Sequence, residues 1–245
     1  MELICAIDLL DGGAVRLVQG NYDRRVDAEA SAPELARRFV AAGCRRLHVV
    51  DLAGARDGAP TQLDVVATIV DAARSEASDV TVEAGGGLRA AADVVATLAI
   101  ADVAILGTAA IAHPGFLQRC AEEHPGRVAA SLDLRGDRPA VDGWIRDVDL
   151  DAVDVAARLL AEGAARLIVT ETSRDGTLAG PDLERLEALR TALPAATLVA
   201  AGGIGSVEDL RALEALGIDG AIVGMALLNG AIDPAEAIAA LEPAR

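Results

Sequence analysis

The chain has 245 residues, of which 52% are hydrophobic but only 2% aromatic, so Ala, Val, Leu and Ile must build its core. A formal net charge of −16 argues against a nucleic-acid partner, which would require a broad basic surface. The 22 basic residues are all arginine. Without lysine, neither a Schiff-base enzyme nor a Walker-type NTPase can operate.

The chain also lacks the signals of export and of membrane insertion. No basic segment precedes an apolar run at the N-terminus, and the uncharged run 220–232 is too short to span a bilayer. Cys5, Cys44 and Cys120 lie far apart and form no CxxC pair. We therefore expect reduced thiols, no metal site, no membrane association and a cytoplasmic location.

Short β-branched segments alternate with segments of helical period along the whole chain. Strands are predicted at residues 2–8, 46–51, 79–84, 102–106, 128–133, 166–170, 197–201 and 220–223. Helices are predicted near residues 32–43, 61–76, 90–99, 114–123, 150–163, 182–192, 206–216 and 233–241. Cap signals precede three of these helices, at Ser31, Ser206 and Asp233. Eight strands alternating with eight helices predict an α/β fold, the (β/α)8 TIM barrel.

Several segments recur at one fixed spacing. Gly85 and Gly202 are separated by the same 117 positions as Gly107 and Gly224, and the acidic segment 7–9 returns at 132–134. We interpret this as a twofold internal half-barrel repeat, with half-barrels at about 1–124 and 125–245 of a single domain covering 1–245. The equal halves disfavour the competing architecture, an open doubly wound sheet.

Acidic residues end several predicted strands, which is where active sites of such barrels lie. Asp8, Asp51 and Asp133 each end a strand, Thr170 ends the sixth strand, and Asp175 lies in the loop that follows it. For any one of these Asp residues, a helix N-cap is the competing interpretation. Asp8 and Asp133 occupy equivalent places on strands one and five, so we expect them to face each other as an acid and a base.

Glycine-rich segments form two further clusters at the ends of strands. Glycine allows the backbone to approach a ligand closely, and N–H groups at the start of a following helix attract phosphate. Two clusters on opposite sides predict a ligand with a phosphate at each end, whereas tight turns without a ligand are the alternative. The candidate binding residues in these clusters are Gly85, Gly86, Gly107, Thr108, Gly202, Gly203, Gly224 and Met225.

Three other residues are weaker candidates. Arg16 follows strand one and could contact a phosphate or pair with Asp11. Trp144 is the only tryptophan, and it could stack on a flat heterocycle or merely cover the rim. His48 lies inside a strand, which favours a place in the core or wall over a role as proton carrier.

Taken together, several segments make the chain resemble the phosphoribosylformimino-aminoimidazole carboxamide ribotide isomerases of histidine biosynthesis from end to end. The matching segments are 7–9 (IDL), 12–20 (GGAVRLVQG), 47–52 (LHVVDL), 85–89 (GGGLR), 131–133 (SLD), 142–144 (DGW), 170–177 (TETSRDGT) and 201–204 (AGGI). The resemblance implies an Amadori rearrangement without any cofactor, in which the aminoaldose ProFAR becomes the aminoketose PRFAR. It also implies a ribotide substrate with two phosphates, in agreement with the two glycine clusters.

The same resemblance implies roles for individual residues. Asp8 would remove the C2 proton of the sugar, and Asp133 would be the acid that aids ring opening. Thr170 and Asp175 would assist, with Asp175 a rival for the acid role. Gly20, Arg16 and Trp144 would contribute to substrate binding. A self-contained barrel needs no partner, so we expect a monomer.

Three alternatives remain at this stage. A related bifunctional enzyme also isomerises phosphoribosylanthranilate, but it carries Arg where this chain has Asp142, whose charge should disfavour that substrate. The cyclase subunit of imidazole glycerol phosphate synthase shares the fold but uses a lysine after strand one, which this chain lacks. A non-catalytic barrel would bind phosphosugars without turnover.

Overall fold

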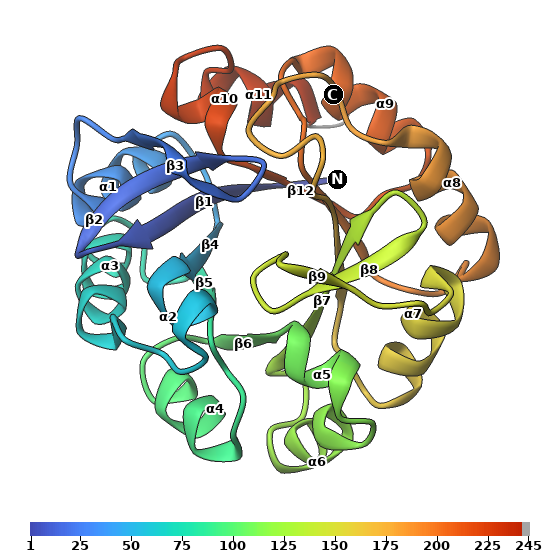
Figure 1. Ribbon diagram of the computed structural model, residues 1–245. Helices are drawn as coiled ribbons and strands as arrows, with labels where there is room; N and C mark the ends of the chain where they lie inside the picture. Colours follow the sequence, from blue (N-terminus) through green and yellow to red (C-terminus); the bar gives the residue numbers. More distant parts are fainter. Residues whose placement is uncertain (242–245) are drawn as a thin grey trace.

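The computed structural model of the protein describes residues 1–241. Eight parallel strands pair edge to edge and close into a ring (Figure 1). In ring order they are β1 (Glu2–Leu10), β4 (Arg46–Asp51), β5 (Thr81–Gly85), β6 (Val103–Leu106), β7 (Val128–Arg135), β10 (Leu167–Glu171), β11 (Leu198–Ala201) and β12 (Gly220–Val223). The predicted (β/α)8 barrel is confirmed, while the internal repeat of its two halves stays a prediction.

A layer of helices surrounds the ring and covers its outer face (Figure 1). The longer helices, one after each strand of the ring, are α1 (Ala32–Ala41), α3 (Leu63–Glu76), α4 (Ala91–Leu98), α6 (Phe116–Glu123), α7 (Ala152–Ala161), α8 (Leu183–Ala192), α9 (Val207–Ala215) and α11 (Pro234–Leu241). Ser206 and Asp209 form a reciprocal capping box at the start of α9. Ser31 occupies the N-cap position of α1, but its side chain accepts no hydrogen bond from the helix.

Additional short elements, which the sequence analysis did not predict, follow several strands of the ring. They are the strands β2 (Gly13–Val18), β3 (Asn21–Asp27), β8 (Arg138–Val141) and β9 (Arg146–Asp147) and the helices α2 (Leu52–Asp57), α5 (Thr108–Ala112) and α10 (Met225–Leu228). β2 and β3 continue from β1 as antiparallel strands, and β8 and β9 continue from β7 in the same way. These hairpins project from the carboxyl ends of β1 and β7 and build the walls of the mouth.

Small and branched residues fill the space inside the ring. Because successive side chains of a strand point to opposite faces, every second residue of each strand points inward. The inner apolar cluster consists of Ile4, Ala6, Val103, Ile105, Ala129, Ile168, Val199 and Ile222. A larger apolar cluster joins the outer face of the strands to the helices. This packing matches the core expected from a composition poor in aromatic residues, and Cys5, Cys44 and Cys120 are buried free thiols.

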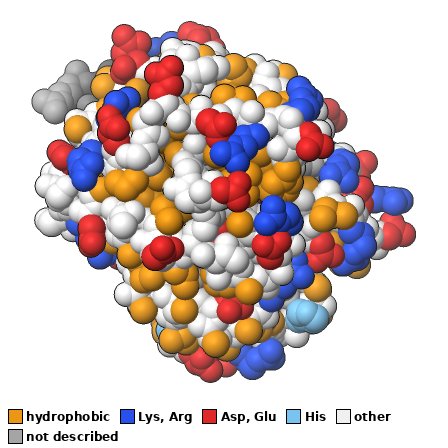
Figure 2. Space-filling model, turned by 60° about the vertical axis from the view of Figure 1, so that its left-hand side comes forward, with side chains coloured by type: hydrophobic (Ala, Val, Ile, Leu, Met, Phe, Trp, Pro, Cys, Tyr) orange, Lys and Arg blue, Asp and Glu red, His pale blue; other side chains and the backbone are white. Residues whose placement is uncertain are grey.

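The surface carries both signs of charge in close proximity. Figure 2 shows one face of the molecule, on which Asp and Glu side chains are interspersed with Arg. Among residues 1–241, no helix has both the length and the apolar character that crossing a membrane requires.

Candidate active site

A pocket of about 230 Å³ opens among the loops at the carboxyl ends of the strands. It is lined by every residue that the sequence analysis predicted as catalytic or binding. These are Asp8, Arg16, Gly20, Gly85, Gly86, Gly107, Thr108, Asp133, Trp144, Thr170, Asp175, Gly202, Gly203, Gly224 and Met225. The fold therefore brings residues from distant parts of the chain into one cavity, although their individual roles do not follow from this proximity.

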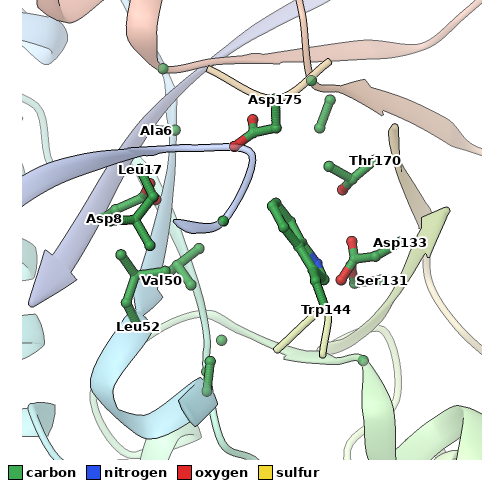
Figure 3. A pocket seen from close by; sticks show the side chains of 18 of the residues that line it. Ala6, Asp8, Leu17, Val50, Leu52, Ser131, Asp133, Trp144, Thr170 and Asp175 are labelled. Atoms are coloured by element: carbon green, nitrogen blue, oxygen red, sulfur yellow. The ribbon is translucent and has the colours of Figure 1, made fainter. Parts of the chain in front are cut away.

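Two predicted catalytic carboxylates lie on opposite sides of this pocket. Asp8 lies near the end of β1 and Asp133 near the end of β7, and Figure 3 shows the pocket between their side chains. Thr170 pairs in register with Asp133 on the neighbouring strand β10, so it lies on the same side. A ligand that fills the pocket would lie between the two carboxylates.

Asp8 forms an ion pair with Arg16. Nη1 of Arg16 lies 2.6 Å from Oδ2 of Asp8, and the guanidinium group also donates a hydrogen bond to the carbonyl of Ala6. β1 and β2 pair as a hairpin, which carries Arg16 back over the end of β1. Asp11 pairs instead with Arg25, at 3.0 Å, so the suggested Arg16–Asp11 pair is wrong.

Asp175 lies half-buried on a third side of the pocket (Figure 3). Burial raises the pKa of its carboxyl from the ordinary value of 3.8 to about 7, and the negative charge of Asp8 adds to this effect. Asp133 raises the pKa further, while Arg16 opposes the rise. Asp175 therefore carries a proton on a large fraction of molecules at neutral pH.

Asp133 has a different environment from Asp175. Its Oδ1 accepts a hydrogen bond of 2.8 Å from the hydroxyl of Ser131, which lies two positions earlier on the same face of β7. Both residues line the pocket, as does Thr170, whose exposed fraction is 8%. Ser131 thus fixes the orientation of the Asp133 carboxylate toward the cavity.

The two glycine-rich segments form tight turns against the pocket. Gly86 has a φ of +110°, and a Cβ there would overlap the carbonyl oxygen of Asp51. Gly203 has a φ of +82°, and a Cβ there would overlap the carbonyl oxygen of Gly180. Only glycine fits at either position, because side chains are disfavoured at positive φ and no space is left for a Cβ. Backbone N–H groups are consequently available at the pocket wall on both sides.

Asp51 is a helix N-cap, which was the competing interpretation for an Asp at the end of a strand. It is the N-cap of α2, and Oδ1 accepts a hydrogen bond of 2.8 Å from the Gly54 N–H. Oδ2 accepts a further bond of 2.6 Å from the N–H of Thr61, and the residue is 3% exposed. Asp51 does not line the pocket, so it anchors the loops rather than contacting a ligand.

A model of the family described as "Histidine biosynthesis protein" matches residues 2–233. The chain belongs to this histidine biosynthesis family. A relative from Sorangium cellulosum is 46% identical, with 98% of this chain and 99% of the relative covered. Relatives from Synechococcus sp. and Synechocystis sp. are 42% and 40% identical, covering 100% and 98% of this chain and 95% and 93% of their own lengths. All three are named 1-(5-phosphoribosyl)-5-((5-phosphoribosylamino)methylideneamino)imidazole-4-carboxamide isomerase. The family expected from the motifs is confirmed.

In this histidine biosynthesis protein, Trp144 lies against the turn between β2 and β3. A Cβ on Gly20 would overlap the indole ring, so the absence of a side chain at Gly20 makes room for it. Trp144 has a φ of +68°, and its carbonyl accepts a 2.6 Å hydrogen bond from Arg135. The indole lines the pocket and projects between Asp8 and Asp133 in the view of Figure 3. Both interpretations of Trp144, stacking on a ligand and covering the rim, fit this position.

To repel a substrate directly, the Asp142 carboxylate would have to face the pocket, and it does not. Its carboxylate lies 3.5 Å from Arg89 and 3.1 Å from Arg146, and its N–H donates a bond of 2.8 Å to the Thr108 hydroxyl. Arg89 lines the pocket, whereas Asp142 does not. Two guanidinium groups thus offset the charge of Asp142, and position 142 supplies no cation of its own.

Several pocket residues received no role from the sequence. His48 lines the pocket wall, a position that fits both of its interpretations, and its hydrogen bond of 2.9 Å to Glu83 was not foreseen. Arg89 and Ser131 stand inside matched motifs, which was the available signal for them. Glu83 could have been noticed as a charged residue in the middle of an otherwise apolar strand. Among residues 1–241, no group of three or more His, Cys, Asp or Glu side chains is arranged to hold a metal ion.

Proposed function

We propose that the protein catalyses the Amadori rearrangement of ProFAR to PRFAR in histidine biosynthesis. The named relatives, which share 40–46% identity over nearly the full chain, support this activity. The observation that carries the proposal is the pocket itself, in which Asp8 and Asp133 lie on opposite sides between two glycine-rich walls. Such a cavity can hold a long anionic ribotide with its sugar carbons beside the carboxylates.

In this proposal Asp8 is the general base. Arg16, at 2.6 Å, holds the Asp8 carboxylate in place beside the pocket. Once the furanose ring has opened and the C1–N bond has become a double bond, Asp8 removes the proton from C2. The electrons of that C–H bond form the C1–C2 double bond and neutralise the nitrogen. The resulting enolamine becomes the ketone when C1 takes up a proton and the C2 hydroxyl group releases one.

The general acid has to supply a proton to the ring oxygen as the C1–O bond breaks. We assign this role to Asp175, because its pKa of about 7 leaves the proton available at neutral pH. Asp133 and Thr170 then orient the sugar hydroxyl groups from the opposite side. We thus choose Asp175 over Asp133 as the acid. The choice depends on the Asp175 carboxyl group being protonated while a neighbouring carboxyl group is ionised.

The phosphates of the substrate would occupy the two glycine-rich walls. Gly85–Gly87 precede α4, and Gly202 and Gly203 precede α9; all of these glycines line the pocket, so their backbone N–H groups would lie beside the phosphates. N–H groups of this kind bind phosphate without a lysine side chain. A formal net charge of −16 makes such local binding necessary, because the protein as a whole repels an anion.

The experiment is an assay of the purified protein with ProFAR, with phosphoribosylanthranilate as a second substrate. We expect conversion of ProFAR and little or no conversion of phosphoribosylanthranilate, since position 142 carries no arginine. Asp8→Asn should abolish turnover while PRFAR still binds within a few-fold of the wild-type affinity. Binding of PRFAR by the wild-type protein without any turnover of ProFAR would instead indicate the non-catalytic barrel and overturn the proposal.

A second assay separates the two candidate acids. Asp175→Asn and Asp133→Asn should both lower kcat, but only Asp175→Asn should remove the decline of kcat/KM that accompanies deprotonation near pH 7. If Asp133→Asn removed that decline and Asp175→Asn preserved it, the acid would be Asp133.

A further inference from the structure

Inside the barrel, a buried carboxylate contacts one wall of the pocket. Glu83 lies in the middle of β5, is fully buried, and pairs in register with His48 on β4. Its Oε1 lies 2.9 Å from Nδ1 of His48. Glu83 does not line the pocket, whereas His48 does. The carboxylate can therefore affect a ligand only through the imidazole.

The other side of Glu83 faces two arginines. Oε2 lies 3.2 Å from Nη1 of Arg166 and 3.7 Å from Nη1 of Arg46. Arg46 is also paired with Glu2, at 2.9 Å. Burial by itself would raise the pKa of Glu83, but the hydrogen bond from His48 and the charges of His48, Arg166 and Arg46 outweigh it and hold the pKa below its usual range. Glu83 is thus an ionised acceptor.

The charged part of this cluster consists of two arginines and two glutamates, whose formal charges sum to zero. The ionised Glu83 carboxylate can only accept, so Nδ1 of His48 carries a proton. A neutral imidazole has one N–H donor and one acceptor nitrogen, so in that form Nε2 is left as the acceptor.

We infer that Glu83 is a positioning residue for the rearrangement, which fixes His48 in the tautomer that presents Nε2 to the pocket as a hydrogen-bond acceptor for a sugar hydroxyl. This inference rests on the proposed function for the identity of the sugar. The tautomer itself depends only on the contacts of Glu83. A carboxylate that orients an imidazole in this way acts without touching the substrate.

Glu83→Gln tests the inference because it should invert the tautomer. The Gln amide has an acceptor oxygen and a donor NH₂ group, and the oxygen would accept hydrogen bonds from Arg166 and Arg46. The NH₂ group would then face Nδ1 of His48, so Nδ1 must accept and the proton must move to Nε2. Two-bond ¹H–¹⁵N correlation spectra distinguish the two tautomers, and the protein has only 3 His to assign.

Glu2→Gln is the matched control. It removes a negative charge from the same cluster, since Glu2 pairs with Arg46, but it makes no contact with His48. We expect the wild-type protein and Glu2→Gln to show the Nδ1–H tautomer, and Glu83→Gln to show the Nε2–H tautomer. If Glu83→Gln does not fold, Glu83→Gln combined with Arg166→Gln restores the charge balance and is compared with Arg166→Gln alone. An unchanged tautomer in the folded Glu83 variant would overturn the inference.

A kinetic cycle tests whether Glu83 acts through His48. Glu83→Gln should lower kcat/KM for ProFAR about tenfold, and Glu2→Gln should leave it unchanged. In a His48→Gln background, Glu83→Gln should have no further effect, because the group that it orients is absent. Independent effects of the two substitutions would overturn the positioning role. A tautomer change in a protein that never converts ProFAR would instead refute the proposed function alone.

Discussion

Arg16 binds Asp8 through an ion pair that is almost shielded from solvent. The Nη1 to Oδ2 distance is 2.6 Å, and the two side chains are 10% and 17% exposed. Such a pair fixes the direction in which the free oxygen of the Asp8 carboxylate points. Arg16 was expected to contact a phosphate, and the ion pair gives it a second role to be tested.

Arg16→Gln should distinguish these two roles. If Arg16 mainly holds Asp8, kcat falls by about tenfold or more while KM changes little, since 1.4 kcal/mol of lost transition-state stabilisation is about tenfold in rate. If Arg16 mainly binds a phosphate, KM rises and kcat is preserved. We expect the loss in kcat, measured by steady-state assay with ProFAR. Arg25→Gln is the control, because Arg25 pairs with the exposed Asp11 and Asp27. A variant with wild-type kcat would rule out the positioning of Asp8.

The barrel could be predicted from the sequence because each of its signals is local. Strands and helices differ in hydrophobic period, and in a closed ring every strand ends at the same rim, so Asp8 and Asp133 could be placed at the mouth. The hairpins β2–β3 and β8–β9 were missed because the segments after strands one and five were expected to be loops, although β2 (GAVRLV) is largely apolar and buried. Gly136 between two extended segments was a turn signal that could have indicated that β8 folds back on β7.

The contacts of the site could not be predicted in the same way, because they depend on the direction in which each side chain points in the folded chain. Arg16 has both Asp8 and Asp11 nearby in the sequence, and only the register of the β1–β2 hairpin decides between them. Glu83 and His48 are 35 positions apart and meet because β4 and β5 pair in a specific register. Asp51 ends β4 and Asp8 lies near the end of β1, but α2 begins directly after Asp51, whose carboxylate caps this helix.

Asp175→Asn should change how the stability of the protein depends on pH. The pKa of Asp175 is about 7 in the folded protein and near 3.8 when unfolded, so the native state holds a proton that the unfolded state has released. The wild-type protein therefore loses stability from this group as pH rises from about 4 to about 7, by an amount on the order of 4 kcal/mol. Asn cannot ionise and suffers no such loss.

The measurement is thermal unfolding of both proteins at about pH 4.5 and about pH 8, on either side of the folded pKa. The Tm of Asp175→Asn relative to wild type should be higher at the alkaline pH than at the acidic one. Titrating groups distant from Asp175 contribute equally to both proteins, so they cancel in this difference. A Tm difference that is the same at both pH values would show that Asp175 is ionised in the folded protein throughout this range.

Gly203→Ala should impair substrate binding much more than a comparable change elsewhere. Gly203 has a φ of +82°, and its missing side chain leaves room for the carbonyl of Gly180. Gly217 has a similar φ of +73°, but nothing lies within 4 Å of its Cβ position. Both substitutions have the cost of a left-handed conformation, about 1–2 kcal/mol. Only Gly203→Ala must also displace the loop that lines the pocket.

The comparison is made on KM and on Tm. We expect Gly217→Ala to lower Tm modestly and to leave KM unchanged. Gly203→Ala should raise KM for ProFAR by about tenfold or more, because the backbone N–H groups of this turn no longer fit a phosphate. Equal effects of the two substitutions on KM would mean that this turn does not contact the substrate.

The two interpretations of Trp144 make different predictions for ligand binding. If the indole stacks on the flat heterocycle of the substrate, binding of PRFAR must change its fluorescence, and Trp144 is the only tryptophan of the chain. Trp144→Phe would keep most of the affinity and Trp144→Ala would lose about fivefold, in line with about 1 kcal/mol for an aromatic pair beyond its buried area. If the indole only covers the rim, both variants bind alike.

We expect the stacked arrangement, because the indole already lines the pocket and Gly20 leaves the room that it needs. Gly20→Ala provides the independent check, since its Cβ would displace the ring without altering the tryptophan. The substitution should shift the fluorescence of the free protein toward that of an exposed indole and weaken PRFAR binding as much as Trp144→Ala does. Normal affinity in Gly20→Ala despite a shifted spectrum would assign the indole to the rim, and the heterocycle would then have to be held by other residues.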